Sequence, residues 1–525
     1  METQGARVQA LRVAARPYPM RIAVTIVLLA SLVAPGARAD AITLVSANPT
    51  GTAADAPSAA IAMARDGTVL FESGASDLVA LPARGGTQVY AWRDGTVRLV
   101  SRAIDGGRSN GTSRALAISA NGRRIAFTST APDALGIGTN PGGHAQLFVA
   151  DLVDDSIVLV SHALGAPTRG GNGPITLAML SEDGSVVAFQ GSPSDVSPRL
   201  AAGENVYAWN GSTEPELVSM NSAGFGGLND SYLKGMSADG RHILFETTGA
   251  NIVQGVVDFN GSFDGFLRDR SAQSTRLVTH RRDDPTTAST NGARTVAVSA
   301  DGRSVLLDSF SEFLAGVGGN SENTYVWSRV SDVYTLVSHR WDDYSTSAGS
   351  LSRAIALSAD GATVLFRSYS TNLVASVDDN AQEDLFVWRA GVGSAVVTRR
   401  ADGSATSWGY FASGFLSEDG KTVAFYSRAA DQNWATDDAN NAWDAFAYDV
   451  ATGDVRTLSV AHGQNRTGKA QSQPRAVLAD GSVLMDSRAG DLAPADVNNA
   501  NDVFVYRRSA LLSDGFSLEC ARLST

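Results

Sequence analysis

Cysteine is almost absent from this chain of 525 residues, which contains only Cys520, near the C-terminal end. A single cysteine excludes an internal disulfide and any zinc site built from paired cysteines. No histidine follows Cys520, so we do not assign it as a nucleophile. A fold without disulfides has to be stabilised by its hydrophobic core, and this chain is long enough to bury a large one.

Lysine is also scarce, so arginine carries most of the positive charge. The formal net charge is −12; the first 39 residues hold five Arg and one Glu, so the remainder carries −16. Nucleic-acid binding needs a basic surface that neutralises phosphates. The acidic balance therefore predicts no nucleic-acid partner.

Long hydrophobic runs are missing, apart from Ile22–Val33. Arginines precede this run and Ala37-Arg38-Ala39 follows it, the pattern of an export signal cleaved before Asp40. At about 12 residues the run is too short to cross a bilayer comfortably, and a retained anchor is the alternative. We expect residues 1–39 to be a signal peptide. The rest should be an exported monomer without a membrane span, in the periplasm or the medium.

A short turn, Asp-Gly or Asn-Gly between two apolar runs, recurs eight times along the chain. This dipeptide is a strong β-hairpin signal because glycine accepts positive φ. The turn glycines are Gly67, Gly122, Gly184, Gly240, Gly302, Gly361, Gly420 and Gly481. Their spacing of 55 to 62 residues is nearly constant, which is typical of a repeat fold.

Each turn belongs to a unit of four predicted strands. The third strand has a central aromatic residue in every unit: Tyr90, Phe148, Tyr207, Phe266, Tyr325, Phe386, Phe446 and Phe504. The fourth strand ends near the letters LVS, but the last unit lacks it, and the missing copy begins at Ala41, before the first unit. A closed ring explains this arrangement, because the N-terminal strand then completes the last unit and leaves no open sheet edge.

We therefore predict an all-β fold, an eight-bladed β-propeller of four-stranded antiparallel blades over residues 40–507. The ring is closed by the N-terminal strand, and residues 508–525 form a C-terminal tail. Two adjacent β-sandwiches are the alternative, but they would not require eightfold internal similarity.

The Asp-Gly hairpins, the third strand written DVFV at Asp502 and the LVS strand resemble the WD40-like, TolB-like β-propeller repeat of exported bacterial proteins. The resemblance covers about Ala41 to Arg507. It is specific for the fold and unspecific for function, since propellers of this kind serve binding, scaffolding and, when fused to other domains, hydrolysis.

The long segments of the repeat share one predicted face of the ring. Strands in a blade are antiparallel, so second-to-third loops and the links between blades lie opposite the short Asp-Gly turns. Binding residues gather on long loops over a rigid frame, so we place any site on this loop-rich face, near the channel mouth. Ser or Thr followed four residues later by Asp or Asn recurs there, as in Ser73/Asp77 and Ser487/Asp491, and predicts a structural turn.

Four of the loops carry the pattern Asp-x-Asn-x-x-x-Asp just before the third strand. The residues are Asp258, Asn260 and Asp264; Asp378, Asn380 and Asp384; Asp438, Asn440 and Asp444; and Asp496, Asn498 and Asp502. Oxygen ligands at this spacing could hold Ca²⁺, as in the first part of an EF-hand loop, although the EF-hand glycine at position six is absent. An Asx-turn that starts the strand is the alternative. The sequence specifies no other cofactor.

Three further features bear on chemistry. Gly107-Arg108-Ser109-Asn110-Gly111 matches the nucleophile-elbow pattern, but no helix follows it, and we interpret it as chance. The six histidines have no His-x-x-x-His spacing, which disfavours a zinc site. Four tryptophans share a third-strand position and predict blade packing: Trp92, Trp209, Trp327 and Trp388. Four others, in long segments, could stack on sugar rings or cover a blade rim: Trp341, Trp408, Trp434 and Trp443.

The blades account for nearly the whole chain and leave no room for a catalytic domain. We therefore expect an exported, non-enzymatic propeller that binds a protein or glycan partner through its loop-rich face. One alternative is a polysaccharide-degrading enzyme with its site in the channel. Another is a structural module stabilised by Ca²⁺.

Overall fold

The computed structural model describes residues 41–508 except 83, 135, 200–202, 212–213, 227–228, 315–316, 318–320, 377, 379–381, 401–410, 429–436 and 439. In this part of the chain the only helical segment is a single 3₁₀ turn, η1 (Pro141–Gly143). The predicted signal peptide, the C-terminal tail, Cys520, Trp408 and Trp434 lie outside the described residues.

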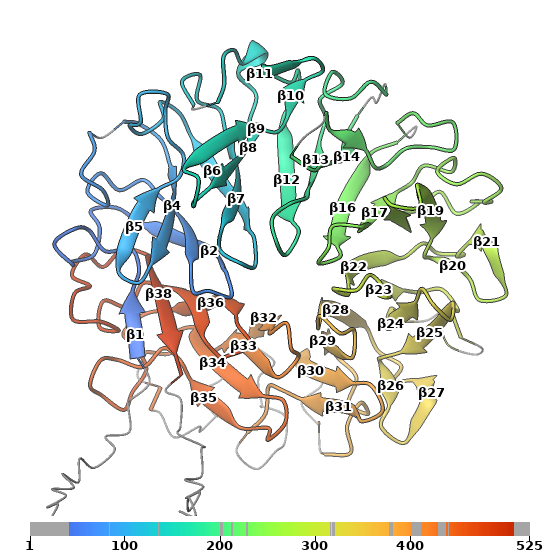
Figure 1. Ribbon diagram of the computed structural model, residues 1–525. Helices are drawn as coiled ribbons and strands as arrows, with labels where there is room; N and C mark the ends of the chain where they lie inside the picture. The colour runs from blue at the N-terminus through green and yellow to red at the C-terminus, as the bar shows by residue number, and fades with distance from the viewer. Residues whose placement is uncertain are drawn as a thin grey trace, which may run out of the picture. The chain divides into compact units, whose positions relative to one another are not determined.

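Eight four-stranded antiparallel sheets form the blades, and Figure 1 shows them arranged in a ring. Blade 1 is β2 (Ser58–Met63), β3 (Val69–Ser73), β4 (Gln88–Arg93) and β5 (Thr96–Leu99); blade 2 is β6 (Ser113–Ile118), β7 (Arg124–Ser129), β8 (Gln146–Asp151) and β9 (Ser156–Leu159). Blade 3 is β12 (Ile175–Leu180), β13 (Val187–Gly191), β14 (Asn205–Trp209) and β15 (Glu216–Leu217); blade 4 is β16 (Ser231–Met236), β17 (His242–Thr247), β18 (Asp264–Asp269) and β19 (Ser274–Leu277).

The second half of the ring repeats this order. Blade 5 is β22 (Arg294–Val298), β23 (Ser304–Ser309), β24 (Asn323–Ser328) and β25 (Val333–Leu336); blade 6 is β28 (Ser352–Leu357), β29 (Thr363–Ser368), β30 (Asp384–Arg389) and β31 (Gly393–Val396). Blade 7 is β32 (Phe411–Leu416), β33 (Thr422–Ser427), β34 (Asp444–Asp449) and β35 (Val455–Thr457); blade 8 is β36 (Ser472–Val477), β37 (Val483–Ser487), β38 (Asp502–Arg507) and β1 (Ala41–Leu44).

The N-terminal strand closes the ring, as predicted. β1 pairs antiparallel with β38, and Leu44 lies opposite Phe504 in the register. Neighbouring first strands contact one another all the way round: β2 with β6, β6 with β12, β12 with β16, β16 with β22, β22 with β28, β28 with β32, β32 with β36, and β36 with β2. These eight innermost strands surround the axial channel.

A buried hydroxyl explains why the third strand begins with Asp, Asn or Gln and the fourth ends in LVS or LVT. In every blade the Ser or Thr hydroxyl after the fourth strand donates to the first side chain of the third strand and accepts the next backbone N–H. The donors and acceptors are Ser101 and Gln88, Ser161 and Gln146, Ser219 and Asn205, Thr279 and Asp264, Ser338 and Asn323, Thr398 and Asp384, Ser459 and Asp444, and Ser46 and Asp502. In blade 8 the hydroxyl comes from the N-terminal segment, 456 residues away, so one motif explains strand pairing and ring closure together.

The hydrophobic core consists of aromatic and aliphatic side chains between successive blades. The apolar residue of each second strand packs on the central aromatic residue of the third, as in Phe71 on Tyr90 with ring centroids 5.4 Å apart. Both of these side chains are completely buried. One core cluster joins Val45, Phe71, Tyr90 and Val503, so β1 and blade 8 share a core with blade 1.

Three two-stranded hairpins between blades were missed by the sequence analysis. They are β10 (His162–Ala163) with β11 (Ala166–Gly170), β20 (His280–Arg281) with β21 (Asp284–Ala288), and β26 (His339–Arg340) with β27 (Asp343–Ser347). Each begins at the histidine that follows the LVS motif. The extra pairing absorbs much of the length by which this repeat exceeds a minimal propeller blade.

Candidate functional site: the cation-lined mouth of the channel

The two ends of the channel are built from different parts of the repeat. The turn mouth is the end formed by the first-to-second turns of blades 1 to 7: Arg65, Ala120, Glu182, Ala238, Ala300, Ala359 and Glu418 line a cavity there. The loop mouth is the opposite end, where the first strands begin after the links between blades.

Backbone hydrogen bonds draw the turns of neighbouring blades together at the turn mouth. Arg65 N–H donates to the carbonyl of Ala120 (3.0 Å), and the same bond links Ala238 to Ala300 and Ala300 to Ala359 (both 2.8 Å). Arg65 also forms ion pairs with Glu182 and Glu418, which belong to blades 3 and 7. Its position in the repeat is an alanine or glutamate in the other blades, so this single arginine places a charged cluster across the turn mouth.

Basic side chains surround the loop mouth although the chain as a whole is acidic. Five blades each contribute one cation from the first strand: Arg114, Lys234, Arg294, Arg353 and Arg475. Arg114 and Arg353 occupy the second strand position, Lys234 and Arg475 occupy the bulge, and Arg294 begins β22. All five side chains are partly exposed. Sequence analysis missed this ring because its members do not share one strand position and never form a motif.

Buried carboxylates of the second strands hold four of these five cations and also connect the blades. A β-bulge in each first strand frees one backbone N–H from the sheet, and the preceding blade accepts it. The bonds run from Ala115 to Glu72, Leu233 to Gln190, Thr295 to Glu246, Ala354 to Asp308, and Ala60 to Asp486. In four of the five cases the second carboxylate oxygen pairs with a ring cation, which fixes the cation at the channel wall.

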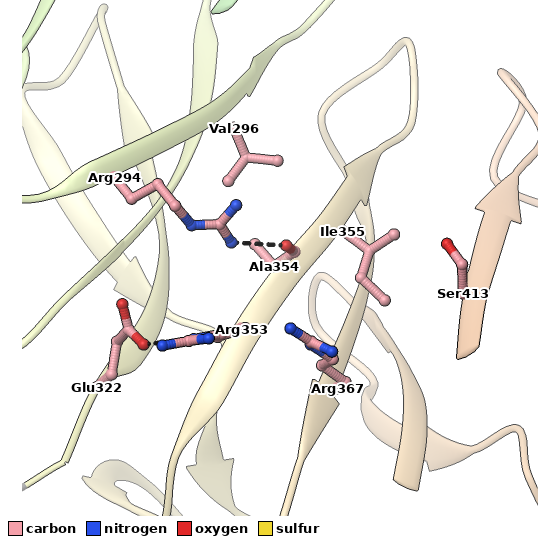
Figure 2. A pocket seen from close by; sticks show the side chains of 8 residues that line it. All are labelled: Arg294, Val296, Glu322, Arg353, Ala354, Ile355, Arg367 and Ser413. Carbon is pink, nitrogen blue, oxygen red and sulfur yellow. Dashed lines mark hydrogen bonds and ion pairs between the residues drawn. The ribbon is translucent and has the colours of Figure 1, made fainter. Parts of the chain in front are cut away.

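A cavity of about 500 Å³ at the loop mouth spans blades 5 to 7. Its lining includes Arg294, Arg353 and Arg367, and Figure 2 shows their three guanidinium groups around one space, with Ser413 on the far wall. The Nε of Arg353 lies 2.7 Å from a carboxylate oxygen of Glu322. The ion pair of Arg367 with Glu383 is longer, at 3.4 Å. Because a guanidinium has five N–H donors, each arginine retains donors for a further anion.

Asp308 lies beneath this cavity and is completely buried. It pairs with Arg294 and accepts hydrogen bonds from the Thr324 hydroxyl at 2.7 Å and the Ala354 N–H at 2.9 Å. Burial raises the pKa of Asp308 to about 6, because desolvation outweighs the attraction of Arg294. The carboxylate is nevertheless largely ionised at neutral pH, so the cation beside it keeps its partner.

Aromatic side chains border the same mouth in blades 4 and 5. A second cavity of about 470 Å³ is lined by Tyr232, Lys234, Phe263, Arg294 and Phe310. Phe263 and Phe310 are about two-fifths exposed, which is unusual for rings of this size in a cavity wall. This wall therefore offers apolar faces beside cationic groups.

The Asp-x-Asn-x-x-x-Asp loops are strand-starting turns in blades 4 and 7. Asp258 and Asp438 accept the backbone N–H of Asn260 (2.9 Å) and Asn440 (3.0 Å), two residues later. The final aspartates, Asp264, Asp384, Asp444 and Asp502, are the acceptors of the Ser or Thr hydroxyl described above. Within the described residues, no three His, Cys, Asp or Glu side chains are grouped closely enough to hold a metal ion.

The other two copies of this loop differ from that pattern. In blade 6, Asn380 lies outside the described residues, and Asp378 is buried. In blade 8, Asp496 is buried and accepts no hydrogen bond. The Asn498 amide donates to the carbonyl of Ala54 at 2.7 Å, and the Asn amides of blades 4 and 7 make the equivalent bond.

The remaining sequence features have structural roles. The Ser109 hydroxyl of the Gly-x-Ser-x-Gly match donates to Gln88 at 3.0 Å, and the neighbouring Arg108 is buried against the carbonyls of Ala75 and Ser76. Residue Ser73 accepts the N–H of Ala75, as predicted for a structural turn. The four third-strand tryptophans are all buried, which confirms the prediction of blade packing: Trp92, Trp209, Trp327 and Trp388.

Two of the predicted sugar-stacking tryptophans can be located. The indole of Trp341 is half exposed, and Trp443 packs edge-on against Tyr426 with ring centroids 5.5 Å apart. Neither lines a cavity of the loop mouth described above.

Comparison with known proteins finds similarity in fold only. No protein-family model matches the chain, and no curated protein matches its sequence. Porphyromonas gingivalis dipeptidyl peptidase 4 is 12% identical, with a TM-score of 0.45 over 83% of this chain and 56% of that chain. A putative TolB from Agrobacterium tumefaciens is 15% identical (TM-score 0.29; 57% of this chain, 83% of that one), and an oligogalacturonate lyase from Vibrio parahaemolyticus is 8% identical (TM-score 0.42; 86% and 97%).

The repeat motif and the eight closed blades decide the fold. The chain is an eight-bladed β-propeller. It spans about half the length of the peptidases that it matches, since 55% of a prolyl endopeptidase and 54% of an acylaminoacyl peptidase are covered. No helix among the described residues is long and apolar enough to cross a membrane.

The prediction of a non-enzymatic binding protein is wrong in that form. Peptidases recur among the solved structures that match, and their propeller domains belong to enzymes. The repeat motif could not reveal this, because it specifies how blades pack and pair and contains nothing of what a propeller is joined to. An enzyme relationship is therefore open to this propeller.

Proposed function

We propose that the propeller acts in an enzymatic reaction on carboxylate-bearing oligosaccharides, and that the loop mouth holds the substrate. The observation that carries this proposal is the convergence of Arg294, Arg353 and Arg367 on one cavity. Arginine presents paired N–H donors that match the geometry of a carboxylate. The acidic partners Glu322 and Asp308 fix two of these guanidinium groups in place before a ligand arrives.

The arrangement of the five first-strand cations favours a substrate that carries a negative charge on each of its repeating units. Cations stand on five of the eight first strands, so an extended ligand meets a new one as it crosses from blade to blade. Uronic acid units carry one carboxylate each, and their apolar ring faces suit aromatic planes such as Phe263 and Phe310. A peptide with a single C-terminal carboxylate would use only one of these positions.

We further propose that the reaction takes place outside the cytoplasm. The arginines, apolar run and Ala37-Arg38-Ala39 of residues 1–39 fit a cleaved signal, which leaves a chain that starts at Asp40 and a propeller over residues 40–507. Mass spectrometry of the protein recovered from an export-competent host should give Asp40 as the first residue.

A ligand pair and a variant pair test the substrate class. The full chain is incubated with a trimeric oligouronate and with its methyl ester, which keeps the sugar rings but removes the negative charges. We expect binding by calorimetry, with new reducing ends or unsaturated product, for the free acid alone. The double variant Arg353→Gln/Arg367→Gln should weaken binding at least tenfold, since it removes two charge-assisted hydrogen-bonding groups.

The matched control is Arg241→Gln. Arg241 is also an arginine held by a carboxylate, Asp269 at 2.7 Å, but it lies on the first-to-second turn side of blade 4. It should bind the oligouronate as the unmodified protein does. Equal binding of acid and ester, or turnover of peptides but not of oligouronates, would contradict the proposal.

A further inference from the structure

The last blade contains two buried carboxylates that have no cationic partner. Asp496 is 4% exposed, and neither of its carboxylate oxygens has a hydrogen-bond partner. Asp502 is completely buried, and its Oδ2 also has none, while its Oδ1 accepts the Ser46 hydroxyl at 2.6 Å. No Arg, Lys or His among the described residues forms an ion pair with either side chain.

Leaving such groups unpaired is costly. An ionised carboxylate loses several kcal/mol of hydration when it is buried, unless a charge or several donors replace the water. Burial raises the pKa of Asp496 and, together with the charge of Asp496, raises the pKa of Asp502 to about 6. The Asn498 backbone N–H opposes the pKa shift of Asp496, and the Asn498 amide opposes that of Asp502, but neither group lies in hydrogen-bonding geometry with the unpartnered oxygens.

In blades 4 and 7 the equivalent carboxylates accept hydrogen bonds from donors within their own loop. There the first aspartate accepts the Asn N–H and is only partly buried or exposed, and in blade 4 the Asn260 amide donates to Asp264 at 3.2 Å. In all three loops the Asn amide donates to a carbonyl of the link to the next blade, in blade 8 from Asn498 to Ala54 at 2.7 Å. The blade 8 loop differs because its first aspartate, Asp496, accepts no N–H. Three carboxylate oxygens therefore remain without a donor at one place in the ring.

We infer that Asp496 and Asp502 bind a Ca²⁺ ion at the closure of the ring. Carboxylate oxygens are hard ligands, and two of them balance the charge of one divalent cation. Main-chain carbonyls and water would complete the six to eight oxygens that Ca²⁺ accepts, whereas Mg²⁺ prefers to keep several of its waters and suits a buried site less well. This inference is independent of the proposed function, because the loop mouth and its arginines take no part in it.

The site lies where the two ends of the propeller meet. The loop before β38 holds the N-terminal segment at several points: Ala53 N–H donates to the carbonyl of Ala495 at 3.0 Å, Ser58 N–H to that of Asn501 at 2.8 Å, and the Asn501 amide to that of Ser58 at 2.7 Å. A cation bound to Asp496 and Asp502 would stiffen this loop. It would therefore stabilise the pairing of β1 with β38.

Calorimetry and thermal unfolding of the chelator-treated full chain test the inference. We expect Ca²⁺ to bind at a single site and to raise Tm by a few degrees, with a smaller effect of Mg²⁺ at the same concentration. Asp496→Asn should abolish both effects. Asp438→Asn, the same loop position in blade 7, should bind and respond as the unmodified protein does.

The inference does not depend on the folding of the variant. If Asp496→Asn cannot be purified, Ca²⁺ binding to the unmodified chain still tests the site. Asp438→Asn then serves as the second measurement. Absence of Ca²⁺ binding would overturn the inference, as would equal losses in Asp438→Asn and Asp496→Asn.

Discussion

The guanidinium of Arg65 lies 2.6 Å from the carboxylate of Glu418, although the two residues belong to blades 1 and 7 and are more than 350 positions apart in the chain. Glu182 of blade 3 pairs with the same arginine. One side chain thus connects three turns across the turn mouth. Backbone bonds link the turns of blades 1 and 2 and, in series, those of blades 3 to 7, while the loop mouth carries cavities of about 500 and 470 Å³.

Replacing Arg65 should open the turn mouth at little cost in stability. The side chains of Arg65, Glu182 and Glu418 are all close to half exposed, so the ion pairs are screened by water. We expect Arg65→Ala to lower the free energy of unfolding by less than about 1 kcal/mol, with a smaller loss at high salt. Denaturant melts at two ionic strengths measure this. A loss of several kcal/mol would mean that the arginine holds the ring together.

Removing the hydroxyl of Ser46 should weaken ring closure. Ser46 is buried, and Ser46→Ala leaves an oxygen of Asp502 and the Val503 N–H without partners, at a cost of about 1–3 kcal/mol. Ser459→Ala is the matched control, because Ser459 makes the same two bonds within blade 7. Hydrogen exchange should increase in β1 and β38 for the first variant and in β34 and β35 for the second. The same exchange pattern in both would contradict the assignment of Ser46 to closure.

Asp308 should make stability fall as the pH rises through the range from about 4 to 6. Its folded-state pKa of about 6 is above the ordinary value of 3.8, so in this range the folded protein keeps a proton that the unfolded chain has lost. The loss should reach about 2–3 kcal/mol and level off above pH 6. Denaturation midpoints of the unmodified protein and Asp308→Asn across this range test it. The variant should lack this component, and parallel profiles would contradict the prediction.

His339 should have the opposite effect. Its Nε2 accepts the Trp388 indole N–H at 3.1 Å, and its Nδ1 donates to the Arg340 carbonyl at 2.7 Å, which requires the neutral ring. Burial lowers the pKa of His339 below the ordinary 6.5, so its contribution to stability is complete above pH 6.5 and is lost as the pH falls below it. Titration by NMR should show the depressed pKa. Trp388→Phe, which removes the donor, should move it upward.

The architecture could be predicted from the sequence because each repeat contains the residues that determine its strand pairing. The Asp-Gly turns define the hairpin of the first and second strands, and the displaced LVS copy that ends at Ser46 indicates closure by the N-terminal strand. Ring closure requires β1 to pair with β38 in one register, and the two hydrogen bonds of Ser46 specify that register.

The loop mouth was not predictable in the same way. Arg114 and Arg353 occupy the second position of their strands, whereas Lys234 and Arg475 occupy the bulge, so no fixed spacing relates them. Whether a bulged residue faces the channel depends on the register of the whole sheet. Likewise, the four Asp-x-Asn loops have similar sequences. The blade 8 loop differs from those of blades 4 and 7 because its first aspartate is buried and accepts no backbone N–H.

Blade 8 is made of strands from both ends of the propeller, so the ring cannot close until β38 has been synthesised. A ribosome that stops before Asp502 leaves β1 without its neighbour and β37 with an open flank, so that two unsatisfied strand edges persist however well the other seven blades are made. Termination within blade 8 should then yield insoluble or rapidly degraded product rather than a slightly shortened propeller.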